Sequence, residues 1–258
     1  MELVYRHHLS SGNEALDTDL RDLQMVSLAS GTYPYAATGQ GGGVTSYSIS
    51  SSGGAATLHD SDGYSGSLQG TTIGELDVLT INGERQLVVG GLDRNGIGGF
   101  RLNNSGSVGY QIVRDLPGAR APSAVISLGA GDAETIFTVD QAGGLLNAFD
   151  VVGNGLIRQA TPSDQRPDFR LDGEVQLATA MIGTRDFIVA ADSGGDGVSN
   201  YRVMDSDTGS LRPVDRLGAE DGLGLNTPTV MQTIGAQNAS WVIIGSAESG
   251  SLSVMRLY

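Results

Sequence analysis

Val198-Ser199-Asn200-Tyr201-Arg202-Val203 is the clearest copy of a six-residue pattern that occurs five times along the chain. Each copy has an aliphatic residue first, Tyr, Phe or Met fourth, and an aliphatic residue sixth. The other copies are residues 44–49, 97–102, 146–151 and 252–257, and successive copies start 53, 49, 52 and 54 residues apart. A repeat of this length holds four short strands and their turns, which is the size of one blade of a β-propeller.

Three further strands are expected in each repeat, separated by turns rich in Gly, Ser and Asp. The first strand ends in a triplet with a central Ser or Thr in four of the five repeats, namely Ser27, Thr80, Ser127 and Thr233. The second strands are expected at 33–38, 85–91, 135–140, 186–192 and 240–246, and the fourth at 55–60, 109–114, 156–160 and 211–216. These small hydroxyl residues either face the central channel of a propeller or pack between blades, and packing is favoured because first strands crowd together there.

The two ends of the chain complete the pattern. The fifth repeat has no fourth strand before Tyr258, whereas residues 2–9 form an extended-looking run where a fourth strand would precede the first repeat. We therefore expect this N-terminal strand to complete the fifth blade, because closing the ring removes exposed sheet edges. The prediction is an all-β fold with one domain over residues 1–258, a five-bladed β-propeller of four-stranded antiparallel blades. A fragment of a longer propeller is the alternative.

The composition excludes several classes of protein. Of the 258 residues 39 are Gly, which disfavours helix interiors and suits turns. The 29 acidic residues outnumber 15 basic ones, all of them Arg, and the net charge is −14. Because nucleic acids and anionic membrane surfaces require a basic cluster, neither is expected as a partner. No apolar run is long enough to span a membrane, and the absence of Cys excludes disulfides and thiol chemistry.

The turns between second and third strands supply the candidate binding residues. In a propeller these turns share one face with the connections between blades, and four of the five carry an acidic residue. The candidates are Asp93, Asn95, Asp140, Asp192, Asp196 and Glu248. Asp and Gly are also what tight turns require, because Asp bonds to nearby backbone and Gly adopts positive φ. The functional interpretation is an acidic rim that binds a cation or sugar hydroxyls.

Asp192 and Asp196 are the candidate metal ligands. The stretch Asp192-Ser193-Gly194-Gly195-Asp196-Gly197 places two carboxylates on a flexible backbone, which suits calcium. It lacks the further ligand positions of an EF-hand, and Ser199 stands where a calcium-binding nonapeptide repeat requires Asp. The three His residues have no zinc spacing. Calcium is therefore the one cofactor considered, and none is required.

Enzyme motifs are few. The chain has no Gly-x-Ser-x-Gly elbow, no Cys nucleophile and no phosphate-binding loop. A propeller glycosidase needs two or three carboxylates that converge on the channel, one of them protonated. Asp77 at the start of a channel strand, together with Asp19, Asp140 and Asp192, could supply them. Trp241, the single Trp, lies in an apolar second strand and is expected in the core rather than as a sugar platform.

Residues 188–203 resemble a known family. Their pattern, apolar-Ala-Ala-Asp-x-Gly-Gly-x-Gly-Val-Ser-x-Tyr-Arg-Val, is similar to repeats of lactonase-type propellers and to propeller regions that precede hemolysin-type calcium-binding repeats in secreted alphaproteobacterial proteins. Lactonase-type propellers have seven blades and this chain accounts for five. The calcium-binding repeats are also missing, so no catalytic residue is transferred. The resemblance implies an extracellular or cell-surface module, with leaderless export and a larger assembly as further implications.

Three functions are compatible with the sequence. The leading one is a non-enzymatic binding or adhesion module that recognises a glycan or protein partner through its loops. The second is a lactonase- or glycosidase-like enzyme with carboxylates at the mouth of the channel. The third is a structural component of a virion, tail-like particle or fibre. Carboxylates that converge at the channel mouth would favour the second function over the other two.

Overall fold

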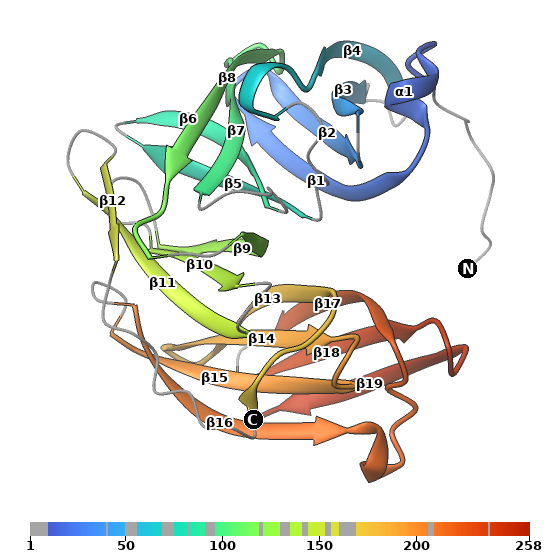
Figure 1. Ribbon diagram of the computed structural model, residues 1–258, viewed down its shortest axis with the longest axis vertical. Helices are drawn as coiled ribbons and strands as arrows, with labels where there is room; N and C mark the ends of the chain where they lie inside the picture. Colours follow the sequence, from blue (N-terminus) through green and yellow to red (C-terminus); the bar gives the residue numbers. More distant parts are fainter. Residues whose placement is uncertain are drawn as a thin grey trace.

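Figure 1 shows the computed structural model of the chain. It describes residues 10–39, 41–49, 56–68, 75–81, 83–90, 96–118, 121–129, 135–140, 144–152, 156–159, 169–205, 209–236 and 238–258. In this described part nearly all regular structure is β-strand. The short helix α1 (Glu14–Asp17) and the 3₁₀ turns η1 (Gly66–Leu68) and η4 (Ala219–Asp221) lie between sheets, and no helix is long and apolar enough to cross a membrane.

Five antiparallel sheets, named blades A to E in chain order, make up the fold. Blade A contains β1 (Leu20–Leu28), β2 (Gly31–Thr38), β3 (Gly43–Ile49) and β4 (Ala56–Gly63). Blade B contains β5 (Leu76–Ile81), β6 (Glu84–Val89), β7 (Gly96–Leu102) and β8 (Val108–Asp115). Blade C contains β9 (Pro122–Leu128), β10 (Thr135–Asp140), β11 (Leu145–Val152) and β12 (Leu156–Gln159). Blade D contains β13 (Val175–Ile182), β14 (Arg185–Asp192), β15 (Gly197–Asp205) and β16 (Ser210–Gly218). Blade E contains β17 (Pro228–Ala236), β18 (Ala239–Ser246) and β19 (Ser251–Leu257).

The all-β, five-bladed propeller predicted from the repeat is confirmed. In every blade consecutive strands are neighbours, so each sheet follows the chain from its inner to its outer strand. Blades A to D have four strands, and blade E has three within the described residues. The N-terminal strand expected at residues 2–9 lies outside the described residues, so its role in closing the ring stays a prediction.

In blades A to D, the large residue at the fourth position of the third strand lies in the core, whereas Met255 in blade E is only partly buried. Phe100, Phe149 and Tyr201 are completely buried, and Tyr47 is nearly so. The third strand is covered on both faces because a blade packs between two neighbours, which explains why this pattern was the clearest in the sequence.

Each connection between blades contributes one leucine to the core. Leu68, Leu116, Leu171 and Leu225 are each buried between the blade that precedes and the blade that follows. Leu16 in α1 is buried as well and precedes blade A in the same way. The segment that contains α1 is thus equivalent to the four connections that join one blade to the next.

Hydroxyl groups join neighbouring inner strands, as the sequence predicts. The Oγ of Ser127 donates to the carbonyl of Val78 at 3.3 Å, and the Oγ1 of Thr233 donates to the carbonyl of Thr179 at 2.7 Å. Ser27 differs, because its hydroxyl contacts the neighbouring strand of its own blade. The expected packing between blades is therefore observed for two of the four residues.

The blades follow one another around an arc (Figure 1). β1 contacts β5, β5 contacts β9, β9 contacts β13 and β13 contacts β17, whereas no contact of that extent joins β17 to β1 in the described part of the chain. One face of blade E carries Val230, Ile234, Leu252 and Val254, each more than half exposed. Trp241 lies on the same face.

Trp241 is 41% exposed, and Cζ of Arg256 lies over its ring, 5.7 Å from the ring centre. The expectation that this residue belongs to the core is therefore wrong. Its place in β18 turns the side chain toward the face of blade E that no other described blade covers, and hydropathy alone does not distinguish the two faces of a strand.

The turns between second and third strands and the connections between blades lie on the same face of the ring. Turns between second and third strands donate backbone hydrogen bonds to the residues that lead into inner strands, and these bonds are Gly39 N to Asp19 O, Gly90 N to Glu75 O, Ser193 N to Glu174 O, and Ala247 N to Thr227 O. Asp19, Ala121 and Thr227 adopt positive φ just before β1, β9 and β17. This conformation changes the direction of the chain where the connection ends and the inner strand begins.

Candidate functional site

Acidic side chains meet where the inner strands of blades A and B begin. Glu75 directly precedes β5 and is 5% exposed. Its Oε2 accepts a hydrogen bond from the N–H of Val125 in β9 at 3.1 Å, and its Oε1 accepts one from the N–H of Leu177 in β13 at 3.0 Å. A single carboxyl therefore connects blade B to blades C and D at the centre of the ring.

Asp22 and Asp77 are half-buried beside Glu75. The Oδ2 of Asp22 in β1 accepts a hydrogen bond from the N–H of Leu76 at 2.7 Å. The Oδ2 of Asp77 in β5 accepts one from the N–H of Ser127 in β9 at 2.5 Å. Each carboxyl thus bonds to the inner strand of the following blade, and the start of β5 brings all three acids together.

The three carboxyl groups share one electrostatic environment. Burial raises the pKa of Glu75 well above its usual value, and the charges of Asp22 and Asp77 add to this rise. Burial also raises the pKa of Asp77 to about 6, with a smaller contribution from the charge of Asp22 and with hydrogen bonds from Ser127 acting in the opposite direction. The pKa of Asp22 is raised by burial as well.

Exposed charged side chains lie at the same end of the inner strands. The Nε of Arg21 lies 2.8 Å from Oδ1 of Asp19, and its Nη1 lies 3.9 Å from Oε1 of Glu174. Since Arg21 belongs to blade A and Glu174 leads into blade D, the longer ion pair joins these two blades. Asp19 and Glu174 are well exposed, so these side chains present hydrogen-bonding groups of both charges to a ligand.

This arrangement is suited to proton transfer. A carboxyl with a pKa near 6 can both hold and release a proton close to neutral pH, and a neighbouring carboxylate can accept one. Asp77 and Asp22 are only partly buried, whereas Glu75 is almost completely buried and positions the start of β5. The sequence suggested Asp77, Asp19, Asp140 and Asp192 for this place. Asp77 lies beside Asp22 and Glu75, and Asp19 pairs with Arg21, whereas Asp140 and Asp192 are buried at the ends of β10 and β14.

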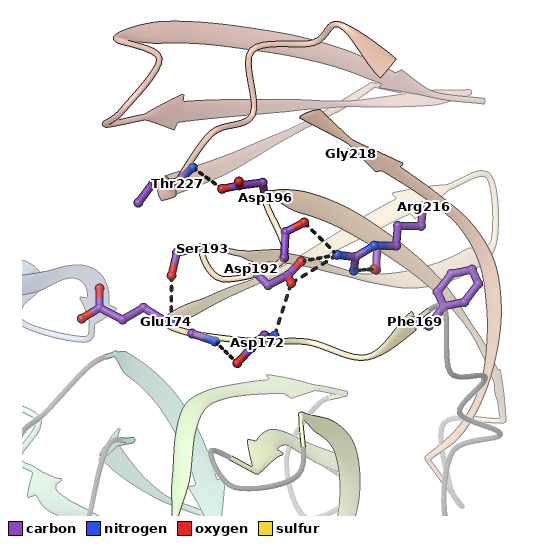
Figure 2. Close-up of polar contacts among 12 residues, drawn as sticks. Phe169, Asp172, Glu174, Asp192, Ser193, Asp196, Arg216, Gly218 and Thr227 are labelled. Atoms are coloured by element: carbon purple, nitrogen blue, oxygen red, sulfur yellow. Dashed lines mark hydrogen bonds and ion pairs between the residues drawn. The ribbon is translucent and has the colours of Figure 1, made fainter. Parts of the chain in front are cut away.

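The residues predicted from the turns have a different environment. Figure 2 shows the turn between β14 and β15, where Asp192 is completely buried. Its carboxylate lies 3.2 Å from Nη2 of Arg216, and its Oδ2 accepts a hydrogen bond from the N–H of Asp172 at 3.2 Å. Burial raises the pKa of Asp192, and Arg216 acts against that rise. Asp192 therefore joins two strands of blade D to the connection that precedes the blade.

Asp196 and Glu248 come together around Thr227. The Oδ1 of Asp196 accepts a hydrogen bond from the N–H of Thr227 at 2.7 Å (Figure 2), and the Oε2 of Glu248 accepts one from its hydroxyl at 3.3 Å. Asp196 is half-buried and Glu248 is exposed. The pair connects the turns of blades D and E through the residue that leads into β17.

The remaining predicted residues do not join this group. Asp140 is buried at the end of β10, and Asp93 and Asn95 lie outside the described residues. Within the described part of the chain no group of three or more His, Asp or Glu residues is arranged to hold a metal ion. Calcium binding at Asp192 and Asp196 stays a prediction without further support.

Asp22 and Glu75 were missed by the sequence analysis. A signal for them does exist, because Asp22 lies five residues before Ser27 and Glu75 lies five residues before Thr80. The acidic residue thus recurs at one position of the inner strand in the first two repeats. The corresponding residues of later repeats are not acidic, so a search for features common to all five repeats overlooks this pair.

Comparisons with known proteins support the fold. No protein-family model matches the chain, and no curated protein sequence matches it. Among solved structures, a putative exo-beta-1,3-galactanase from Bifidobacterium bifidum s17 is similar with a TM-score of 0.62 and 12% identity, over 96% of this chain and 90% of that one. An exo-beta-1,3-galactanase from Phanerochaete chrysosporium, solved with galactose, has a TM-score of 0.61 and 10% identity, over 95% of this chain and 63% of that one.

Lactonases are also among the similar structures. A putative 6-phosphogluconolactonase from Bacteroides fragilis has a TM-score of 0.53 and 17% identity, over 90% of this chain and 69% of that one. The resemblance to lactonase-type propellers is thus supported at the level of fold, whereas nothing supports the hemolysin-type repeat context. The leading expectation of a non-enzymatic binding module gains no support either, and the similar structures named here are described as enzymes.

Proposed function

We propose that the protein is a glycoside hydrolase that acts at the mouth of the propeller channel. The observation that carries the proposal is the convergence of Asp22, Glu75 and Asp77 at the start of β5. Hydrolysis of a glycosidic bond requires a carboxyl group that donates a proton to the leaving oxygen and a second carboxylate on the opposite side of the sugar. The galactanases among the similar structures make a galactose-containing glycan the first substrate to test.

Asp77 is the proposed general acid and Asp22 the proposed carboxylate that activates water or attacks the sugar. Asp77 is half-buried and has a pKa of about 6, so a useful fraction of it is protonated near neutral pH. Glu75 is a positioning residue, because its two oxygens bond to the backbone of blades C and D and it fixes the start of β5 between the two aspartates.

Substitution of the two aspartates tests the proposal. Asp77→Asn and Asp22→Asn each retain an oxygen that can accept the backbone hydrogen bond, so the fold is expected to persist. Each should lower kcat/KM on p-nitrophenyl β-D-galactoside and on β-1,3-linked galactobiose by about 10²- to 10⁴-fold. Asp186→Asn is the matched control. This half-buried aspartate lies near the start of β14, at the end of blade D opposite to Asp192.

The pH profile provides a second measurement. Because the general acid must be protonated, kcat/KM should fall as the pH rises above about 6. Wild-type protein that hydrolyses neither glycoside, or Asp22→Asn and Asp77→Asn variants as active as Asp186→Asn, would contradict the proposal.

Lactone hydrolysis is the second candidate, favoured by the lactonases among the similar structures. Measuring kcat/KM of the wild type and the same variants on D-glucono-1,5-lactone distinguishes lactone hydrolysis from glycoside hydrolysis. A phosphorylated lactone is disfavoured because Arg21, the cation identified at the described mouth, is already paired with Asp19 and Glu174. An extracellular location, expected from the sequence, suits an enzyme acting on polysaccharide and stays a prediction.

A further inference from the structure

A groove lies along the outer part of the interface between blades D and E. Its volume is about 500 Å³, and it runs between β15 and β16 on one side and β19 on the other. Its apolar lining includes Phe187, Val189, Val198, Leu217 and Val242. A space of this size is within the range of small-molecule sites, which combine apolar walls with a few polar groups. None of the acids at the centre of the ring lines this groove, so it is independent of the function proposed above.

Three arginines of blade D gather at this groove. Arg202 in β15 lies directly opposite Arg212 in β16. On its other side Arg202 is opposite Phe187 of β14, and Arg185 precedes Phe187 by two residues. Opposite residues in adjacent strands, and residues two apart in one strand, lie on the same face of a sheet. The three arginine side chains therefore start from one face of blade D, and all three line the groove.

These arginines form no ion pair with any acidic residue that the structure describes. Asp215 also lines the groove, yet it makes no ion pair with them. The Nε of Arg202 is shielded from solvent and makes no hydrogen bond within the described part of the chain, and the same holds for Oδ1 of Asn200, two residues earlier in β15. Like charges directly opposite each other destabilise a sheet, and unpaired buried polar atoms add to that cost.

Blade B shows how an arginine at this position can be neutralised. Arg101 holds the fifth position of its third-strand pattern, as Arg202 does in blade D. Arg101 is opposite Gln86, and the Oε1 of Glu84, two residues before Gln86, lies 2.5 Å from Nη2 of Arg101. Arg185 occupies in blade D the place of Glu84 in blade B, because each precedes by two the residue opposite the arginine. The charge that neutralises the arginine in blade B is therefore reversed in blade D.

The reversed charge gives an apolar groove a cationic side, in a protein whose net charge is −14. A carboxylate accepts paired hydrogen bonds from guanidinium groups, and its charge relieves the repulsion among neighbouring arginines. The apolar lining of the groove can cover a hydrocarbon body attached to that carboxylate. From the unpaired arginines, the buried Nε and the groove, we infer that Arg185, Arg202 and Arg212 bind an organic acid that has an apolar body.

Octanoate is the probe that tests the inference, with octan-1-ol and acetate as matched compounds that lack the charge or the apolar body. Isothermal titration calorimetry with the full chain should show that octanoate binds at least about 10-fold more tightly than either compound. Its affinity should fall as NaCl is raised from about 0.05 to 0.5 M, because salt screens the exposed part of the attraction. Octan-1-ol or acetate binding as tightly as octanoate, or no binding of octanoate, would overturn the inference.

Arg185→Glu reproduces the arrangement of blade B and should lower the affinity for octanoate at least about 10-fold, because the new carboxylate pairs with Arg202 and repels the ligand. Arg212→Gln removes one charge at an exposed position and should also weaken binding. Arg101→Gln is the matched control, since it removes an arginine from the equivalent strand position outside the groove. Octanoate should raise the Tm of the wild type and of R101Q but not of R185E. Equal affinity of R185E, R212Q and R101Q for octanoate would contradict the assignment of these arginines.

Discussion

The proton on Glu75 links the chemistry of the channel to the stability of the ring. Its carboxyl keeps a raised pKa in the folded protein because burial, aided by Asp22 and Asp77, disfavours its charge. The folded state therefore binds more protons than the unfolded state at pH values above the ordinary pKa of Glu. The stability that Glu75 contributes is present below that value and is lost as the pH rises through the folded pKa.

Glu75→Gln should remove this dependence. As the pH rises from 5 to 8, the Tm of the wild type should fall relative to that of E75Q, which carries no titrating group at this site. Differential scanning calorimetry across this range measures the difference. Glu14→Gln, at an exposed position of α1, should track the wild type at every pH. A wild-type Tm that rises relative to E75Q would show that Glu75 is ionised in the folded state.

Among the elements, the turn between β14 and β15 depends most on one pair of charges. Asp192 is inaccessible to solvent and Arg216 is 19% exposed, so the ion pair of Figure 2 is largely shielded from water. Removing one member of a buried pair leaves the other charge unpaired, which costs about 3–5 kcal/mol. The pair therefore holds β14 to β16 across β15.

Asp192→Ala should accordingly lower the free energy of unfolding by about 3–5 kcal/mol, measured by urea denaturation. Asp215→Ala, which removes an exposed carboxylate from the same strand as Arg216, is the control and should change it by less than about 1 kcal/mol. Calcium added to the wild type tests the metal hypothesis in the same assay. Equal stability of the two variants would mean that Arg216 finds another partner.

The strands of each blade were predictable because a propeller repeats one pattern. The aliphatic and aromatic positions of residues 97–102 mark a strand covered on both sides, and residues 96–102 form β7. Which face of a strand is left exposed was not predictable from the sequence, as Trp241 in β18 shows. The acids of the channel were also only partly predictable, because Glu75 acts through contacts with β9 and β13 that no local spacing encodes.

At the scale of the whole molecule, the net charge of −14 acts against the compact state. Some of the acids are offset by ion pairs, among them those that Arg21, Arg101 and Arg216 form in the described part of the chain. Mutual repulsion of the remaining acids is weakened by salt, which screens exposed charges beyond about 10 Å at 0.1 M.

The Tm at pH 7 should therefore rise when NaCl is increased from about 0.05 to 0.5 M, as monitored by circular dichroism. Near pH 4.4, the isoelectric point expected from the sequence, the same increase should have little effect. A lower Tm in high salt at pH 7 would mean that attractive ion pairs outweigh repulsion.

The acids near the centre of the ring are distributed unevenly among the blades. Asp22, Glu75 and Asp77 all come from blades A and B, whereas the hydroxyl Thr233 and the carbonyl of Thr179 occupy inner strands on the far side. Five similar blades therefore carry unlike inner strands, and the buried acids that join the strands at the centre of the ring are supplied by only two of them.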